Sequence, residues 1–155
     1  MTPSPNQHSR PLPAPAARVV RAEVTEAPIS VTELADAVQD AAAGAVVTFE
    51  GVVRNHDADR GVSGIGYSCH PTAGQIVKEI ARDVAERRRV RALGVVHRVG
   101  DLAVGEAALA VAVSSDHRAE AFFTCGEIVE EVKKRLPVWK RQTFSDGTSQ
   151  WSNLA

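Results

Sequence analysis

HRAEAFFTCGEIVEEVKKRLPVWKRQTF, residues 117–144, predicts a helix, a corner and a strand in direct succession. The helix begins near His117, and its apolar side chains recur at helical spacing, at Phe122, Ile128, Val129 and Val132. Pro137 lacks a backbone N–H and cannot continue the helix. Residues 138–144 then have the composition of a strand. The segment therefore brings a helix end and a strand together at a proline corner.

Upstream of this corner the chain alternates between apolar, β-branched segments and helical patterns. The former predict strands at residues 18–24, 45–54, 62–69, 91–98 and 106–114. Downstream, the hairpin signal Asp146-Gly147 leads to a last short strand that ends near Trp151. The elements do not follow the regular strand–helix–strand order of a parallel sheet. We therefore expect the α+β class, with a mixed or antiparallel sheet and about three helices.

Two capping boxes mark the starts of the other helices. Ser30 with Glu33 opens a helix that we expect to run to about residue 43, where Gly44 stops it. Thr72 with Gln75 opens a second helix over about residues 73–89.

Length and composition indicate one ordinary globular domain. The chain has 155 residues, of which 44% are hydrophobic and 24% charged, with a formal net charge of -1. Five of the eight prolines lie within residues 1–15, so we expect a disordered tail over 1–17 and a single domain over 18–155. The near-zero charge predicts no nucleic-acid or membrane partner.

The two cysteines, Cys69 and Cys125, are too far apart for a zinc-ligand spacing and too few for a secreted disulfide scaffold. We expect reduced thiols in a cytoplasmic protein, without a metal or a cofactor. Cys125 falls inside the third predicted helix and fits the core better than a nucleophile. Cys69 and His70 are adjacent on a strand, so they point to opposite faces and form no direct pair.

Cations gather around the proline corner. Three of the four lysines lie within eight residues, at Lys133, Lys134 and Lys140, together with Arg135 and Arg141. One interpretation is a solvated helix end whose cations suit the helix dipole. However, Lys140 lies beyond Pro137, so a helix lysine and a strand lysine can converge on one pocket. Such a pair could supply a base or an amine nucleophile, or could bind a phosphate.

Two other cationic positions could join that pocket. His117 and Arg118 follow a strand at the start of a helix, where free N–H groups favour anions. The alternative is a simple N-cap by Ser115 or Asp116. Arg54 ends an apolar strand and is either a surface arginine or part of an anion site. His97-Arg98 ends another strand, and we expect structural hydrogen bonds there rather than catalysis.

Taken in order, these segments resemble the large subunit of molybdopterin synthase. The matching stretches are GAVVTFEGVVRNH (44–56), VVHRVGDLAVGE (95–106), SSDHRAEAF (114–122) and KKRLPVWKRQ (133–142), followed by Trp151. They cover nearly the whole chain from about residue 18, in the order and spacing of that family. The resemblance implies an α/β-hammerhead fold.

The resemblance also implies an activity and partners. It implies a sulfurtransferase that moves sulfur from a small ubiquitin-like subunit, which carries a C-terminal Gly-Gly thiocarboxylate, to cyclic pyranopterin monophosphate, forming molybdopterin. It further implies a homodimer of large subunits within a cytoplasmic heterotetramer. The sulfur donor belongs to the partner, so no catalytic cysteine is required.

Matched position by position, Lys133 and Lys140 correspond to the catalytic lysines of the family. The substrate-binding positions correspond to Arg54, His117, Arg118, Arg141 and Gln142. The substrate and the incoming tail are both anionic, which suits a cationic site. We therefore expect the two lysines to meet His117 and Arg118 in a single anion-receiving cleft.

The chain departs from the family pattern at three places. Gln142 stands where many members carry Glu, and Ala73 stands where Met is frequent. Ser68-Cys69-His70 takes the place of a frequent Glu-x-Tyr pattern. One alternative is thus a non-catalytic paralogue that binds the ubiquitin-like partner without turnover. Another is an RNA or phosphate-ligand binder that uses the basic run 133–141. The net charge and the aromatic content of 5% argue against RNA.

Overall fold

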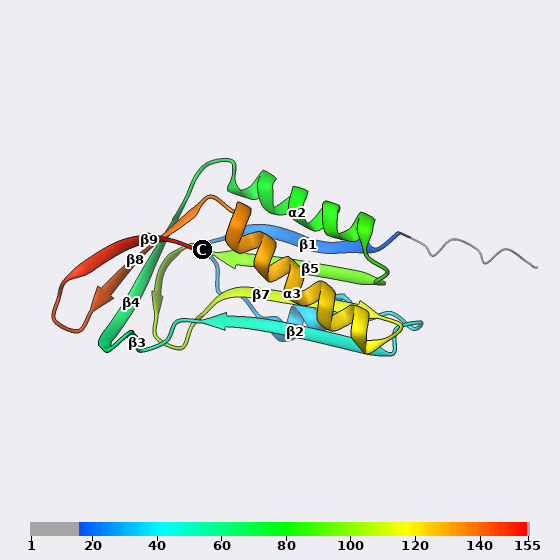
Figure 1. Cartoon of the computed structure of the whole chain (residues 1–155), viewed down its shortest axis with the longest axis horizontal. Coiled ribbons are helices and arrows are strands. Elements are labelled where there is room, and N and C mark those ends of the chain that lie inside the picture. Colours follow the sequence, from blue (N-terminus) through cyan, green and yellow to red (C-terminus); the bar gives the residue numbers. More distant parts are fainter. Residues whose placement is uncertain (1–15, 155) are drawn as a thin grey trace, which may run out of the picture.

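A mixed four-stranded sheet forms the larger layer of the protein, for which the computed structural model describes residues 16–154 (Figure 1). Its order is β1 (Arg18–Thr25), β5 (Ala92–Arg98), β7 (Ala107–Ser115) and β2 (Ala45–Val52). β1 and β5 are parallel, whereas β5–β7 and β7–β2 are antiparallel. β5 and β7 are buried along almost their whole length, as expected for central strands covered on both faces.

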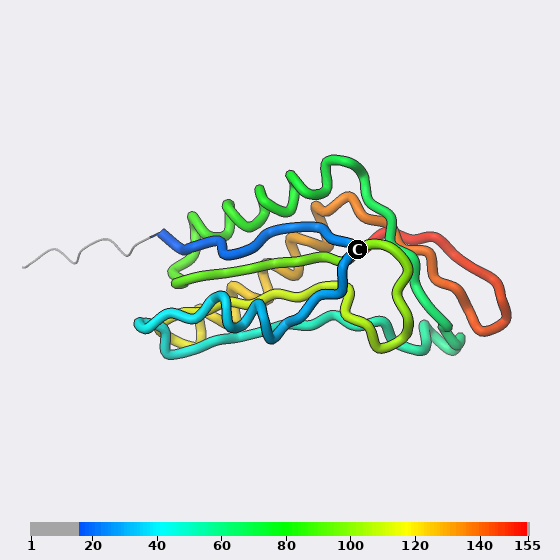
Figure 2. The backbone as a smooth tube through the Cα atoms, turned by 180° about the vertical axis from the view of Figure 1, so that it is seen from behind, coloured from blue at the N-terminus to red at the C-terminus, as the bar shows by residue number. Residues whose placement is uncertain are grey.

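Helices cover both faces of this sheet. α2 (Ala73–Arg87) and α3 (Arg118–Arg135) lie side by side on one face (Figure 1), and α1 (Val31–Ala37) lies on the other, nearer the viewer in Figure 2. Gly94 of β5 permits the close approach of α1, because a Cβ at this position would lie 2.5 Å from Cδ1 of Leu34.

A second sheet crosses one end of the first (Figure 1). β4 (Arg60–Cys69) pairs antiparallel with β8 (Val138–Phe144), with β6 (Gly100–Ala103) and with the short β3 (His56–Asp57), and β9 (Ser149–Asn153) pairs with β8. A small cluster of buried apolar side chains joins the two sheets, including Val53, Ile65, Leu102 and Phe144. The end of the main sheet and the inner face of the second sheet therefore meet at one junction.

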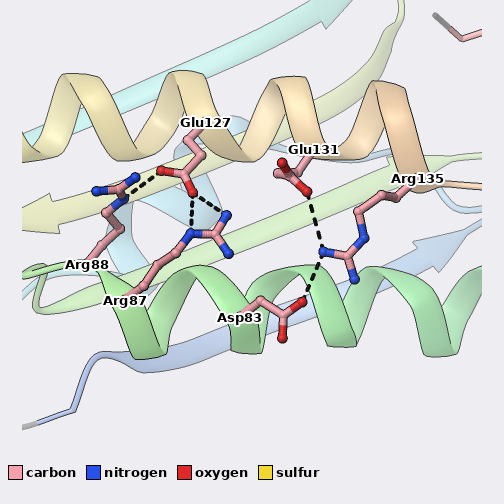
Figure 3. A network of polar contacts seen from close by, with 6 residues as sticks. All are labelled: Asp83, Arg87, Arg88, Glu127, Glu131 and Arg135. Carbon is pink, nitrogen blue, oxygen red and sulfur yellow. Dashed lines mark hydrogen bonds and ion pairs between the residues drawn. The ribbon is translucent and has the colours of Figure 1, made fainter.

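Ion pairs link α2 to α3 along their outer surface (Figure 3). Glu127 of α3 accepts hydrogen bonds from Nε of Arg87, at 2.5 Å, and from Nε of Arg88, at 2.6 Å. At the C-terminal end of α3, Arg135 donates to Asp83 of α2 at 3.0 Å and to Glu131 at 3.4 Å. These contacts hold the last turn of α3 in a defined place beside α2.

The α+β class and the mixed sheet are confirmed, and residues 16–154 form three helices, as expected. Two local predictions are wrong. The first helix ends at Ala37 rather than near residue 43, because a separate turn follows in which Asp40 accepts a hydrogen bond from the backbone N–H of Ala42. Thr72 makes no side-chain cap, because its hydroxyl pairs with Nδ1 of His70 at 2.8 Å.

The expected disordered tail falls almost entirely outside the described residues. None of the helices within residues 16–154 has the length and apolarity that a bilayer crossing requires.

Candidate active site

A cavity of about 240 Å³ lies at the junction of the two sheets. We call it the junction cleft. It is lined by the last residues of β2 and the segment after it, by the inner face of β4 and β8, by the ends of β5 and β7 and by the last turns of α3. Among the described residues that line it, none is Asp or Glu, while Arg54, Lys133 and Lys140 are cations. The junction cleft therefore favours anionic ligands.

The proline corner brings the two lysines to this cleft. Lys133 stands in the last turn of α3, the chain turns at Pro137, and Lys140 follows on β8. In the antiparallel ladder Lys140 lies directly opposite Tyr67 of β4, whose side chain also lines the cleft. Lys134 lines a different surface groove, together with Phe122 and Phe123, so the three neighbouring lysines divide between two places.

Arg54 reaches the junction cleft from the segment after β2. Its guanidinium lies 3.5 Å from a carboxylate oxygen of Asp57, and about two thirds of the side chain remains exposed. His56 lines the cleft beside it. Arg54 is thus free to turn toward an incoming anion at only a small cost, since exposed ion pairs contribute little.

Gln142 and Arg141, both predicted to bind substrate, lie on opposite faces of β8. Gln142 is 7% exposed and lines the cleft, opposite Ile65. Arg141 points away: its Nε donates to the hydroxyl of Ser149 at 3.1 Å, and its guanidinium lies 6.0 Å from the Trp151 ring centroid. Arg141 therefore lies outside the cleft of its own copy, because successive strand residues face opposite ways, and its part in substrate binding stays a prediction.

His117 and Arg118 do not meet the lysines within one chain. They stand at the start of α3, sixteen and fifteen residues before Lys133, which is about 22 to 24 Å along the helix. His117 lines a separate surface depression with Arg91 and Asp116. The single cleft that we expected, with the two lysines beside His117 and Arg118, is therefore not formed within one copy of the chain.

The alternative of a simple N-cap by Ser115 or Asp116 does not describe the start of α3 either. His117 itself occupies the N-cap position, without a side-chain cap. Ser115 donates to the Arg89 carbonyl at 3.3 Å, and Asp116 accepts two hydrogen bonds from Arg91, at 2.6 and 2.8 Å. The hydrogen bond from Arg91 holds the pKa of Asp116 below its usual value.

His97 and Tyr67 are cleft residues that the sequence did not single out as functional. His97 is 2% exposed and its Nδ1 lies 2.7 Å from the Arg98 carbonyl oxygen. Burial lowers the pKa of His97 to about 4, with a further lowering from the charge of Lys133. Burial also raises the pKa of Tyr67. Both side chains thus present uncharged polar groups to the cleft at neutral pH.

The thiols do not contribute to this site. Cys125 lies in the main core, as predicted, and burial raises its pKa to about 11, which suppresses the reactive thiolate. Cys69 is exposed at the end of β4. Within residues 16–154, no group of three or more His, Cys, Asp or Glu side chains is arranged to hold a metal ion. The chemistry available in the cleft is that of amines, a guanidinium and neutral hydrogen-bonding groups.

Comparisons with known proteins identify the family of the chain. The family model described as MoaE protein matches residues 24–135. The molybdopterin synthase catalytic subunit of Aspergillus clavatus is 36% identical over 148 residues, which are 95% of this chain and 74% of that protein.

Solved structures share the fold. Molybdopterin synthase from Staphylococcus aureus superimposes with a TM-score of 0.79 at 28% identity, covering 85% of this chain and 96% of that one. A chain in a complex of subunits 1 and 2 of molybdopterin-converting factor from Helicobacter pylori matches with a TM-score of 0.62, covering 89% of this chain and 90% of that one. Because the two sequences are only 18% identical, this match shows the fold alone. The fold is the expected α/β-hammerhead, and the chain belongs to the MoaE protein family.

Proposed function

We propose that this chain is the catalytic subunit of a molybdopterin synthase. It transfers sulfur from the thiocarboxylated C-terminus of a small ubiquitin-like subunit to cyclic pyranopterin monophosphate. The observation that carries the proposal is the junction cleft, in which Arg54, Lys133 and Lys140 come together from three elements without a carboxylate. Both reactants are anions, and a cleft with this charge attracts both.

The two lysines take different parts in this proposal. Lys133 is an exposed side chain of the cleft lining, on the last turn of α3, which the ion pair between Arg135 and Asp83 holds beside α2. It acts as a base or an amine nucleophile toward the carbonyl of the tail. Lys140 is partly buried and held by the β4–β8 ladder, and it stabilises negative charge that develops in the transition state. Arg54 binds the phosphate, for which a guanidinium fork is well suited, and Gln142 offers an uncharged amide to the pterin.

His117 and Arg118 enter the proposal through a second copy of the chain. β2 is an edge strand that pairs only with β7 among the described residues, and it exposes Val46 by 47% and Val52 by 52%. Antiparallel pairing of two β2 strands about a twofold axis would continue the sheet. Because Ala45 lies opposite Ser115, this pairing brings the His117 end of one copy beside the Arg54 end of the other.

The partner of the proposed enzyme is a small subunit with an extended C-terminal tail. The Helicobacter pylori relative of this fold is a complex of two subunits, which supports a two-subunit assembly here. An extended tail ending in Gly-Gly is narrow enough to enter a cleft of about 240 Å³. We place the assembly in the cytoplasm, where both thiols would remain reduced.

Reconstitution of sulfur transfer tests the proposal. Purified chain, thiocarboxylated small subunit and cyclic pyranopterin monophosphate should yield molybdopterin, measured as its fluorescent oxidation product. Lys133→Ala should lower the rate by at least about 10²-fold, as expected for a group acting in the transition state. Lys134→Ala is the matched control, because this neighbouring lysine lies outside the cleft, and it should retain the wild-type rate.

Two results would contradict the proposal. Tight binding of the small subunit without any product would identify a non-catalytic paralogue. Equal rates for the Lys133→Ala and Lys134→Ala proteins would remove Lys133 from the chemistry.

A further inference from the structure

The imidazole of His97 has a fixed tautomer. A carbonyl oxygen can only accept, so Nδ1, which lies 2.7 Å from the Arg98 carbonyl oxygen, must carry the proton and donate. In the neutral ring Nε2 then has a free lone pair and can only accept. The ring meets Tyr67 edge to face, with centroids 5.2 Å apart and an interplanar angle of 75°, which restricts its rotation.

Nε2 has no hydrogen-bond partner within the part of the chain that the structure describes, although the ring lines the junction cleft together with Lys133. The two residues are near enough for the charge of Lys133 to lower the pKa of His97, which burial already brings to about 4. At neutral pH, a buried ring with a free acceptor therefore faces a cleft whose charged groups are all donors.

We propose that His97 is a positioning residue for Lys133, whose amine donates a hydrogen bond to Nε2 of the neutral imidazole. This inference rests on the proposed function of Lys133. A carboxylate in the same place would also hold the amine, but it would cancel the positive charge that attracts the substrate and the tail. A neutral acceptor restricts the flexible lysine stem and leaves the charge of the cleft unchanged.

A pair of substitutions separates this role from a purely structural one. In His97→Gln, the side-chain amide reaches about as far as Nε2 and can present its oxygen to Lys133, but it leaves the Arg98 carbonyl without its donor. In His97→Asn, the shorter amide can still donate to the Arg98 carbonyl but leaves nothing at the Nε2 position. The proposal predicts that His97→Gln keeps kcat within about threefold of wild type. His97→Asn should lose on the order of tenfold or more in kcat, the effect of one hydrogen bond to a charged group. KM for the small subunit should change little in either protein.

The contrary outcomes are equally distinct. If His97 serves only the Arg98 carbonyl, His97→Asn should be the more active of the two. A higher kcat in His97→Asn than in His97→Gln would overturn the inference. It would also be overturned if both proteins kept the wild-type kcat, or if both lost kcat equally. Activity of the wild type, with inactivity of Lys133→Ala, shows in the same assay that the proposed function itself stands.

A measurement on the unsubstituted site guards against misfolded variants. Nitrogen NMR of protein labelled at histidine should give His97 an unprotonated Nε2 at neutral pH, and Lys133→Met should shift that resonance toward the position of a free acceptor. A protonated Nε2, or a resonance unmoved by Lys133→Met, would refute the contact.

Discussion

Adjacent residues of β8 have unrelated surroundings because the strand alternates. Lys140 and Gln142 face the junction cleft, whereas Arg141 between them packs near Trp151 on the outer face. The same rule at β5 turns His97 inward and leaves Arg98 partly exposed, where it forms an ion pair with Glu106 at 2.5 Å. At the scale of single residues, the strand face decides which cations can meet a substrate.

The low pKa of His97 predicts a loss of stability in mild acid. The folded protein binds the proton only near pH 4, whereas the unfolded chain binds it near pH 6.5. The stabilisation is therefore complete above pH 6.5 and decreases as the pH falls toward 4. Between pH 7.5 and pH 5 the free energy of unfolding should fall by about 2 kcal/mol from this group, measured by urea denaturation.

His97→Gln is the control for this prediction, because it has no ring to protonate while all other ionisable groups remain. The variant should lose about 2 kcal/mol less than the wild type over the same pH interval. Parallel pH profiles of the two proteins would show that His97 is not the group responsible.

Among the elements, α3 has the largest influence on the site. Its last turn carries Lys133, its first residues carry the cations proposed to serve the other copy, and its buried side sits on β7 and β2. The ion pairs with α2 in Figure 3 fix the position of this helix along the sheet. A shift of α3 would move both of its functional ends together.

Glu127→Gln should weaken the attachment of α3. The change removes the charge that pairs with Arg87 and Arg88, and because both arginines are partly exposed we expect a cost of only about 1 kcal/mol in the free energy of unfolding. The cost should shrink in high salt, which screens such pairs. Thermal unfolding at two salt concentrations measures both effects.

Glu130→Gln provides the matched control, since Glu130 is an exposed carboxylate of the same helix outside the network in Figure 3. It should leave the stability within about 0.5 kcal/mol of wild type. An equal loss in the two variants would assign the effect to the net charge of the helix rather than to the contacts of Glu127.

In the whole molecule, one copy provides only part of the cation set that the sequence predicted. The junction cleft holds Arg54, Lys133 and Lys140, while His117 and Arg118 lie at the far end of α3. The exposed Val46 and Val52 of β2 offer apolar surface on the edge strand with which a second copy is proposed to pair. Completion of the site by a second copy is therefore a proposal about the assembly, to be tested on the assembly itself.

A mixed dimer tests this completion. One copy carries Lys133→Ala and the other carries His117→Ala with Arg118→Ala, and two different tags isolate the mixed species. If each cleft takes its lysines from one copy and His117 and Arg118 from the other, one of the two clefts is intact. The mixed dimer should then regain about half of the wild-type activity.

Each variant alone, as a homodimer, should be nearly inactive, which supplies the baseline. A mixed dimer no more active than the homodimers would show that the two sets of residues do not cooperate across copies. A chain that elutes as a monomer in the presence of the small subunit would refute the twofold arrangement directly.

By itself the sequence determined the class of the fold and most of its elements, because hydrophobic periodicity, proline and β-branched residues act over short stretches of chain. The strand over residues 138–144 and the helix that ends before Pro137 follow from those local rules. It also determined the family, through motifs whose order along the chain is specific, and it marked the two lysines that flank the corner.

Only the tertiary structure decided which marked residues share a cleft. Arg141 faces outward, and His97 enters the cleft as a neutral acceptor. His117 and Arg118 lie about 22 to 24 Å along the helix from Lys133. β6 pairs with β4 across the end of the main sheet, a contact between segments far apart in sequence. Strand facing, burial and pKa depend on neighbours brought in by long-range packing, and no local pattern contains that information.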